Sequence, residues 1–299
     1  MRIAKRILLF LAVNFLVVIT VSILLSIFNV RPYLTEYGID YAHLLIFCFV
    51  WGMGGAFISL ALSRKMAKWM MGVKVIDPKT LEPSQKALIA EVAALTKKAK
   101  IPMPEVGIFK SPEVNAFATG PTKKRSLVAV SSGLLEKMDN DQVAGVLAHE
   151  ITHIANGDMV TMTLLQGVVN AFVMFLARVL AFVLSGLGRG DRRGSYGSYF
   201  LFTMLFQIVF MILGSMIVLW FSRWREFRAD AGGAKLAGRE KMISALQGLK
   251  SHVNKRYKVT EKAALQTMKI STQTKTGLAR LFSSHPPLEE RIERLKTWA

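Results

Sequence analysis

Four long apolar runs dominate the pattern of hydrophobic and polar positions along this chain of 299 residues. They cover residues 7–28, 43–62, about 159–186 and about 198–221. A helix needs about 20 apolar residues to cross about 30 Å of hydrocarbon, and its backbone must satisfy its own hydrogen bonds there. The pattern therefore predicts four transmembrane helices in two hairpins. These runs explain why hydrophobic residues make up 52% of the chain.

The first run is expected to be a retained anchor. The basic start "MRIAKR" also suits a signal peptide. However, the apolar stretch is longer than the 7–15 residues of a signal-peptide core, and no small-x-small cleavage site follows it.

Basic residues set the expected orientation in the membrane. The net charge is +19, and basic clusters flank the apolar runs: Arg2, Lys5, Arg6, Arg64, Lys65, Lys68, Arg223, Arg225 and Arg228. Such clusters face anionic headgroups and stay cytoplasmic. The partner of the basic surface is therefore expected to be the lipid bilayer, with no nucleic acid. The arginine-rich loop 187–197 opposes this orientation and leaves open whether residues 159–221 fully span the bilayer.

Two single residues within the runs add little to this picture. Arg178 is either a functional intramembrane charge or a side chain that reaches the interface from near a helix end, and the second interpretation is favoured. Cys48 is the only cysteine, so no internal disulfide forms and a reducing compartment is permitted.

The polar segments predict a small sheet between helices. Residues 84–100 read as an amphipathic helix with Ser84 as its N-cap. Three short strands follow at 105–110, 114–120 and 126–132. A helix over 139–155 then begins at a capping box and ends at Asn156-Gly157. After the last run come two helical stretches, a segment at 254–278 that is expected to be mobile, and a short closing helix.

These elements define the expected fold class: mainly α, a polytopic membrane protein with four transmembrane helices and a cytoplasmic zincin-like α+β catalytic domain. Four parts are expected: a transmembrane hairpin (1–62), a catalytic part (63–158), a second hairpin (159–221) and a cytoplasmic helical part (222–299).

Residues 147–158, "LAHEITHIANGD", contain the sequence H-E-x-x-H. On a helix His149 and His153 share one face, so both can reach one ion. Neutral imidazoles with a carboxylate suit a catalytic zinc site that keeps one position for water. Glu150 can then act as the general base on that water. Two solvent-facing histidines are the alternative, but the surrounding helix is apolar.

A third protein ligand is required, and three candidates remain open: Asp158, His285 and Glu226. Glu226 is preferred because Asp230 lies one turn later on the same helical face. One carboxylate can bind the metal while the other holds the free ring nitrogen of a ligand histidine. The alternative for Glu226 is an ion pair with neighbouring arginines.

Four segments resemble the HtpX-type membrane-integrated zinc endopeptidases, distant relatives of the CAAX-prenyl endopeptidases. They are "AHEITHIANGDMVTMTLLQGVVNAF", "NAFATG", "FSRWREFRADAGGAKLAGREKMI" and "HPPLEERI". The resemblance implies one Zn²⁺ per chain, held by His149, His153 and Glu226. It implies a catalytic Glu150 and Asp230 behind a ligand. It also implies a substrate cleft formed by the following residues: Asn115, Ala116, Phe117, and His285 or Arg291.

The expected function is that of a membrane-anchored zinc endopeptidase acting at the cytoplasmic face. The resemblance implies degradation of misfolded or damaged membrane proteins in the bacterial inner membrane. The strand at 114–120 could bind an extended peptide along its edge. A non-proteolytic zinc carrier or sensor is the alternative, motivated by Asn170, Arg178 and Gln207 in the runs; a basic membrane adaptor is another. The candidate ligands flank the runs, which favours the protease.

Overall fold

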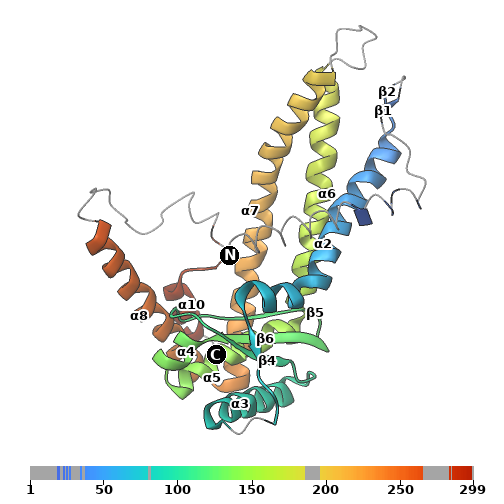
Figure 1. The fold of residues 1–299 in the computed structure, drawn as a ribbon. Helices are drawn as coiled ribbons and strands as arrows, with labels where there is room; N and C mark the ends of the chain where they lie inside the picture. The colour runs from blue at the N-terminus through green and yellow to red at the C-terminus, as the bar shows by residue number, and fades with distance from the viewer. Residues whose placement is uncertain are drawn as a thin grey trace. The chain divides into compact units, whose positions relative to one another are not determined.

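The protein is mainly helical and contains a small mixed sheet, as the computed structural model shows (Figure 1). The structure describes residues 19, 20, 23, 25, 27, 34, 35, 38–79, 82–185, 196–264, 283 and 285–297. The chain divides into two compact units: Met1–Ala61 with Thr161–Val218, and Leu62–Val160 with Leu219–Ala299. The mainly helical class with a small sheet is confirmed. The four-part division and the zincin-like arrangement stay predictions.

Three described helices are long and apolar enough to cross a membrane. They are α2 (Tyr41–Met71), α6 (Asp158–Ser185) and α7 (Tyr196–Ala237). Many of their large apolar side chains are exposed, among them Phe49, Phe172, Phe200 and Trp220. Exposed apolar surface on such helices is suited to contact with lipid. The protein is therefore a membrane protein. Most of the first predicted span, 7–28, lies outside the described residues.

The unit that contains the apolar helices is held by direct helix contacts. In Figure 1, α6 and α7 run side by side, and Gly214 of α7 lies against Val169 and Val173 of α6. The guanidinium of Arg178 in α6 lies 5.5 Å above the ring of Phe47 in α2. A short two-stranded hairpin, β1 (Leu34–Thr35) and β2 (Gly38–Ile39), precedes α2.

The other unit is built on a four-stranded sheet with the order β3-β4-β6-β5. The strands are β3 (Lys74–Val75), β4 (Glu105–Phe109), β5 (Ala116–Thr122) and β6 (Arg125–Ser131). Strands β4 and β6 are parallel, and the other two pairings are antiparallel. The three predicted strands are confirmed, and β5 is an edge strand. Strand β3 was not predicted, because two residues carry no alternating pattern.

The core of this unit lies between one face of the sheet and three helices. These are α3 (Pro83–Ala99), α5 (Asn140–Asn156) and α8 (Arg239–Ala264). Ala116 and Ala118 of β5 pack towards this core. Phe117 packs on the opposite face, with ring centroids 5.6 Å from Phe109. Two short helices complete the unit: α4 (Ser132–Lys137) and α10 (Leu288–Thr297).

Helix α5 begins and ends where the sequence predicts. Asp139 is the N-cap, and its carboxylate accepts a 2.8 Å hydrogen bond from the Gln142 amide. Gly157 ends the helix with φ +70°, a left-handed conformation that glycine adopts without a steric cost. Both H-E-x-x-H histidines thus lie on one regular, capped helix.

One prediction of local structure was wrong. Ser84 is not the N-cap of α3. Glu82 holds that position, and Pro83 starts the helix because its fixed φ suits the first turn. The Ser84 hydroxyl instead donates a 2.8 Å hydrogen bond to Glu82. The segment expected to be mobile is helical over residues 254–264, where α8 continues, and residues 265–278 lie outside the described part.

Close packing of α5 on α8 depends on Gly145. A Cβ atom at this position would lie 2.5 Å from the Lys241 carbonyl oxygen and 2.7 Å from Ala245 Cβ. We expect Gly145→Ala to force the helices apart and to lower the free energy of unfolding by about 1–3 kcal/mol. Unfolding of the purified protein in detergent measures this. Gly157→Asn is the control, since its Cβ meets no atom within 4 Å and asparagine tolerates this conformation. Equal stabilities of the two variants would contradict the prediction.

Candidate metal centre

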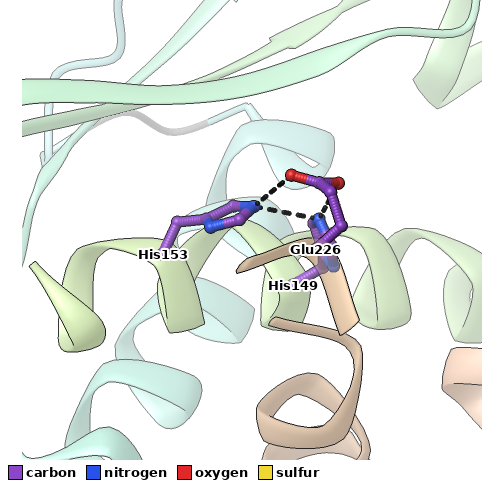
Figure 2. Close-up of side chains that lie close together, drawn as sticks. All are labelled: His149, His153 and Glu226. Carbon is purple, nitrogen blue, oxygen red and sulfur yellow. Dashed lines mark hydrogen bonds and ion pairs between the residues drawn. The ribbon is translucent and has the colours of Figure 1, made fainter. Parts of the chain in front are cut away.

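Helices α5 and α7 bring two imidazoles and one carboxylate together. His149 and His153 lie one turn apart on α5, and Glu226 projects from α7 (Figure 2). The two Nε2 atoms are 3.1 Å apart. Each lies 3.4 Å from one oxygen of Glu226: Oε2 for His149 and Oε1 for His153. All three side chains are buried, and that of Glu226 is only 1% exposed.

This spacing fits a tetrahedral zinc ion. With metal–ligand distances of about 2.0–2.1 Å, two ligands of such an ion lie about 3.3 Å apart. The two Nε2 atoms, 3.1 Å apart, are close to that value, and each lies 3.4 Å from a different oxygen of Glu226. The donor set of two imidazoles and one carboxylate is also typical of catalytic zinc, with a fourth position left for water. The residues present therefore fit the metal that the sequence predicts.

The far side of His149 is held by a carboxylate. Asp230, one turn after Glu226 on α7, lies 3.0 Å from His149 Nδ1. Arg291 of α10 binds Asp230 through two hydrogen bonds of 2.6 and 2.7 Å. The Nη1 atom of Arg291 also lies 3.7 Å from Glu226 Oε2. The arrangement fixes the ring of His149 with Nε2 directed towards Glu226.

The far side of His153 is held by a different carboxylate. Asp158, the first residue of α6, places Oδ2 2.5 Å from His153 Nδ1. It is itself buried. Arg225 Nε lies 3.9 Å from the same oxygen, and Arg225 Nη2 donates a 3.3 Å hydrogen bond to Glu226. Each ligand histidine thus has its own carboxylate, and an arginine accompanies each carboxylate.

The electrostatics of the centre favour positive charge on the imidazoles. Burial opposes protonation of His153, but hydrogen bonds to Asp158 and Glu226 outweigh it and raise its pKa to about 9. The pKa of His149 is raised as well, with burial again opposed by Asp230 and Glu226. Burial disfavours the ionised form of Glu226, yet its histidine contacts hold its pKa far below the ordinary range. A cation bound between these side chains would be stabilised by the same carboxylates that stabilise the protonated imidazoles.

Glu150 and His285 lie at the periphery of the cluster. Glu150 is half-buried, and its charge helps to raise the pKa of His153. His285 Nδ1 lies 2.9 Å from Glu226 Oε2, and this side chain is 62% exposed. Arg223 supports the segment before His285 through a 2.8 Å hydrogen bond to the Ser283 carbonyl. His285 is therefore on the solvent-accessible side of the centre.

The structure distinguishes the three candidates for the third ligand. Glu226 faces the Nε2 atoms of both histidines, whereas Asp158 contacts only the opposite edge of the His153 ring. His285 has no contact with either ligand imidazole among the described interactions. The sequence also allowed an ion pair between Glu226 and neighbouring arginines. Glu226 does pair with Arg225, and it makes this contact in addition to its contacts with the histidines. Of the three candidates, Glu226 is thus the one placed beside both Nε2 atoms, with Asp230 at the far side of His149, and its role as the third ligand stays a prediction.

Sequence reasoning missed the pairing of Asp158 with His153 and the part played by Arg225. The distance of five residues between His153 and Asp158 was a usable signal, because the left-handed Gly157 returns the chain beside the last helical turn. Nothing in the local sequence of Arg225 shows that its side chain bridges two carboxylates.

Three of the predicted cleft residues, Asn115, Ala116 and Phe117, lie at the start of the edge strand. Asn115 precedes β5; its carbonyl oxygen accepts a hydrogen bond from the backbone N–H of Ser131, and its own backbone N–H donates one to the Ser131 hydroxyl. Helix α5 packs against β5, on the face that Ala116 occupies. Phe117 points to the opposite face of the sheet, where it packs with Phe109. Phe117 can therefore contribute only its backbone to a cleft beside α5. The cleft itself stays a prediction.

A buried cluster of two histidines from an H-E-x-x-H helix and a glutamate from a second helix, in a protein whose described residues include three membrane-length helices, is typical of the membrane metallopeptidases. Residues 82–299 match the family model described as Peptidase family M48. The chain belongs to this family and is a metalloendopeptidase. The predicted resemblance to HtpX-type enzymes is confirmed by the relatives described next.

Several full-length relatives share about half of their residues with this chain. The chain is 52% identical over 301 residues to the Protease HtpX homolog of Bacillus subtilis (strain 168), which covers 98% of this chain and 99% of the relative. It is 49% identical over 294 residues to Protease HtpX of Thioalkalivibrio sulfidiphilus (strain HL-EbGR7), covering 98% of each chain.

The fold is also similar to that of a solved structure. The crystal structure of S. mikatae Ste24p superposes with a TM-score of 0.63 at 18% sequence identity. The match covers 98% of this chain and 65% of the Ste24p chain. At this identity the likeness concerns the fold.

Proposed function

We propose that the protein is a zinc-dependent endopeptidase that cleaves unfolded or damaged membrane proteins at the cytoplasmic face of the bacterial inner membrane. The observation that carries the proposal is the convergence of His149, His153 and Glu226, with Glu150 adjacent to the first ligand. In this proposal these three residues hold one Zn²⁺. Bound there, zinc would lower the pKa of a water molecule and polarise the scissile carbonyl.

Glu150 handles the proton in the proposed reaction. Its carboxylate accepts one proton from the water as the water oxygen bonds to the carbonyl carbon. The C–N bond then breaks, and Glu150 passes that proton to the leaving nitrogen. The new products are a carboxylic acid and an amine. A half-buried carboxylate suits this role, because it must exchange a proton with bound substrate while remaining shielded from bulk water.

His285 is suited to bind the reacting carbonyl. Of the side chains that contact Glu226, it is by far the most exposed, at 62%, compared with 18% for Arg225 and 7% for Arg291. It therefore lies where a peptide approaches. A ring N–H at this position could donate a hydrogen bond to the carbonyl oxygen as negative charge develops there.

The edge of β5 offers a place for an extended peptide. Among the described residues this strand pairs with β6 alone, and it packs on the helix that carries both histidines. Adding a substrate strand to a free edge uses main-chain hydrogen bonds, which are independent of side-chain identity. Such binding suits an enzyme that acts on many unfolded sequences.

The proposed membrane side rests on charge and chain position. Basic residues lie on the polar extensions of two apolar helices: Arg64, Lys65 and Lys68 of α2, and Arg223, Arg225 and Arg228 of α7. Basic segments of this kind stay cytoplasmic. All three proposed ligands belong to the compact unit that contains these extensions. A zinc carrier would need ligands along its spans, so this distribution favours the endopeptidase.

Removal and return of the metal test the proposal. Chelator-treated protein is expected to lose nearly all cleavage of a labelled unfolded protein, and one equivalent of Zn²⁺ per chain is expected to restore it. Zinc content is measured in the same samples by atomic absorption. Zinc flux across liposomes without peptide cleavage would support the carrier instead, and cleavage that persists without zinc would refute the proposed centre.

A further inference from the structure

The shortest polar contact at the metal centre is not a contact between two of the three proposed ligands. It joins Asp158 Oδ2 to His153 Nδ1 at 2.5 Å. The corresponding contact of Asp230 with His149 Nδ1 is 3.0 Å. Asp158 is also as thoroughly buried as the ligands, with an exposed fraction of 5%. A carboxylate in this environment needs a partner, and the imidazole is the closest one available.

Three features of the chain place Asp158 at the imidazole. Helix α5 ends at Asn156, Gly157 turns the chain in a left-handed conformation, and Asp158 begins α6. The side chain thus returns to the last turn of α5, where His153 lies. Nδ1 and Nε2 are on opposite edges of the ring, so contact with Asp158 leaves Nε2 directed to Glu226, 3.4 Å away. Asp158 can therefore fix the ring without entering the metal shell.

We infer that Asp158 is a positioning residue for His153, and that Arg225 keeps the carboxylates of Asp158 and Glu226 at a fixed distance from each other. This inference rests on the proposed metal site. Hydrogen bonding of the far ring nitrogen to a carboxylate fixes the tautomer and the ring orientation, and makes the coordinating nitrogen a better donor. The two ligand histidines then have separate supports from separate helices: Asp230 of α7 for His149, and Asp158 of α6 for His153.

The two supports differ in how strongly an arginine engages the carboxylate. Arg291 binds both oxygens of Asp230 at 2.6 and 2.7 Å. Arg225 Nε is 3.9 Å from Asp158, and among the described residues this nitrogen has no hydrogen-bond acceptor. Asp158 therefore keeps more of its charge for the imidazole. Arg225 instead acts as a spacer, because its Nη2 atom is bonded to Glu226 at 3.3 Å.

Zinc affinity in the absence of turnover tests the inference. All variants carry Glu150→Gln, so that self-cleavage cannot remove the protein, and free Zn²⁺ is set by competition with a coloured chelator. We expect Asp158→Asn to weaken zinc binding about 10–100-fold, the usual effect of removing such a partner. Asp230→Asn is the matched variant for the other histidine and is expected to weaken binding to a similar degree. The absorption spectrum of the Co²⁺ form is expected to change in both.

Asp158→Ser separates positioning from a role in starting α6. Serine at this first helical position keeps a small polar side chain near the free backbone N–H groups of the first turn, but it removes the charge beside His153. We expect this variant to unfold at the parental temperature when metal-free, and still to bind zinc about 10–100-fold more weakly. If Asp158→Asn binds zinc as tightly as the parent and its Co²⁺ form has the parental absorption spectrum, the inference is overturned. A loss of affinity that appears only with unfolding of the metal-free protein would also overturn it. A parent that binds no zinc would instead refute the metal site itself.

Discussion

Replacing Glu150 by glutamine is expected to reduce cleavage of an unfolded protein at least about 100-fold, and up to about 10⁴-fold, the range of general acid–base catalysis. The amide has nearly the same size as the carboxylate but cannot accept a proton from water at neutral pH. It is not one of the three groups that converge on the proposed ion, so zinc content is expected to remain at one per chain. Cleavage is measured with a labelled unfolded substrate, and zinc is measured in the same preparation.

The matched control for this variant is Asp141→Asn, another carboxylate-to-amide change on the same helix. Asp141 lies in the first turn of α5, is 66% exposed, and pairs with Lys241. Its loss is expected to leave cleavage within about twofold, because an exposed ion pair contributes little to stability. Full activity of Glu150→Gln would remove the proposed base from the mechanism.

Self-cleavage gives a second measurement on the same pair of proteins. An endopeptidase that acts on unfolded chains is expected to degrade its own unfolded fraction during purification. Wild-type protein with zinc should therefore lose its full-length band on incubation, whereas Glu150→Gln should keep it. A stable wild-type band in the presence of zinc would contradict self-cleavage.

Helix α5 could be predicted from sequence because every local signal agreed. Asp139 supplied a cap, the apolar spacing gave the helical period, and Gly157 supplied the stop. The i, i+4 spacing then placed His149 and His153 on one face without further information. The closeness of Glu226 to these histidines was expected for a related reason, since Glu226 and Asp230 also lie four residues apart on a helix.

Contacts across long stretches of the chain could not be predicted from local patterns. Arg291 reaches Asp230 across 61 residues, and only the family resemblance had placed it near the site. Strand β3 pairs with β4 across a whole helix, and two residues show no period. Ser84 was misassigned because two N-terminal signals overlapped, and the fixed φ of Pro83 outweighed the preference of serine for a cap.

The roles of Asp158 and Arg225 were missed because they depend on where α6 begins. The apolar pattern predicted a span at about 159–186, and Asp158 was one of three candidates for the third ligand. In the structure α6 starts at Asp158 itself, directly after Gly157, so that the same residue begins a membrane-length helix and contacts a proposed ligand. The start of α6 thus places the carboxylate of Asp158 beside His153.

Replacing Glu226 by alanine is expected to lower zinc affinity more than about 100-fold, beyond the range that loss of a supporting carboxylate produces. Glu226 is the one carboxylate that faces both Nε2 atoms, and it is 1% exposed. Its removal leaves two imidazoles without an anionic partner on the metal side, and it leaves Arg225 without its hydrogen-bond acceptor. Competition with a coloured chelator in the Glu150→Gln background measures the affinity.

The order of the effects identifies the ligand. If Glu226 binds the metal and Asp158 only supports His153, Glu226→Ala must be more severe than Asp158→Ala, because the second change leaves all three donor atoms in place. Glu240→Ala is the control, since this glutamate is 87% exposed and distant in role from the centre. Equal losses in the Glu226 and Asp158 variants would mean that both carboxylates bind the ion. A greater loss from Asp158→Ala would exchange their roles, and the helix that supplies the third ligand would then be α6 rather than α7.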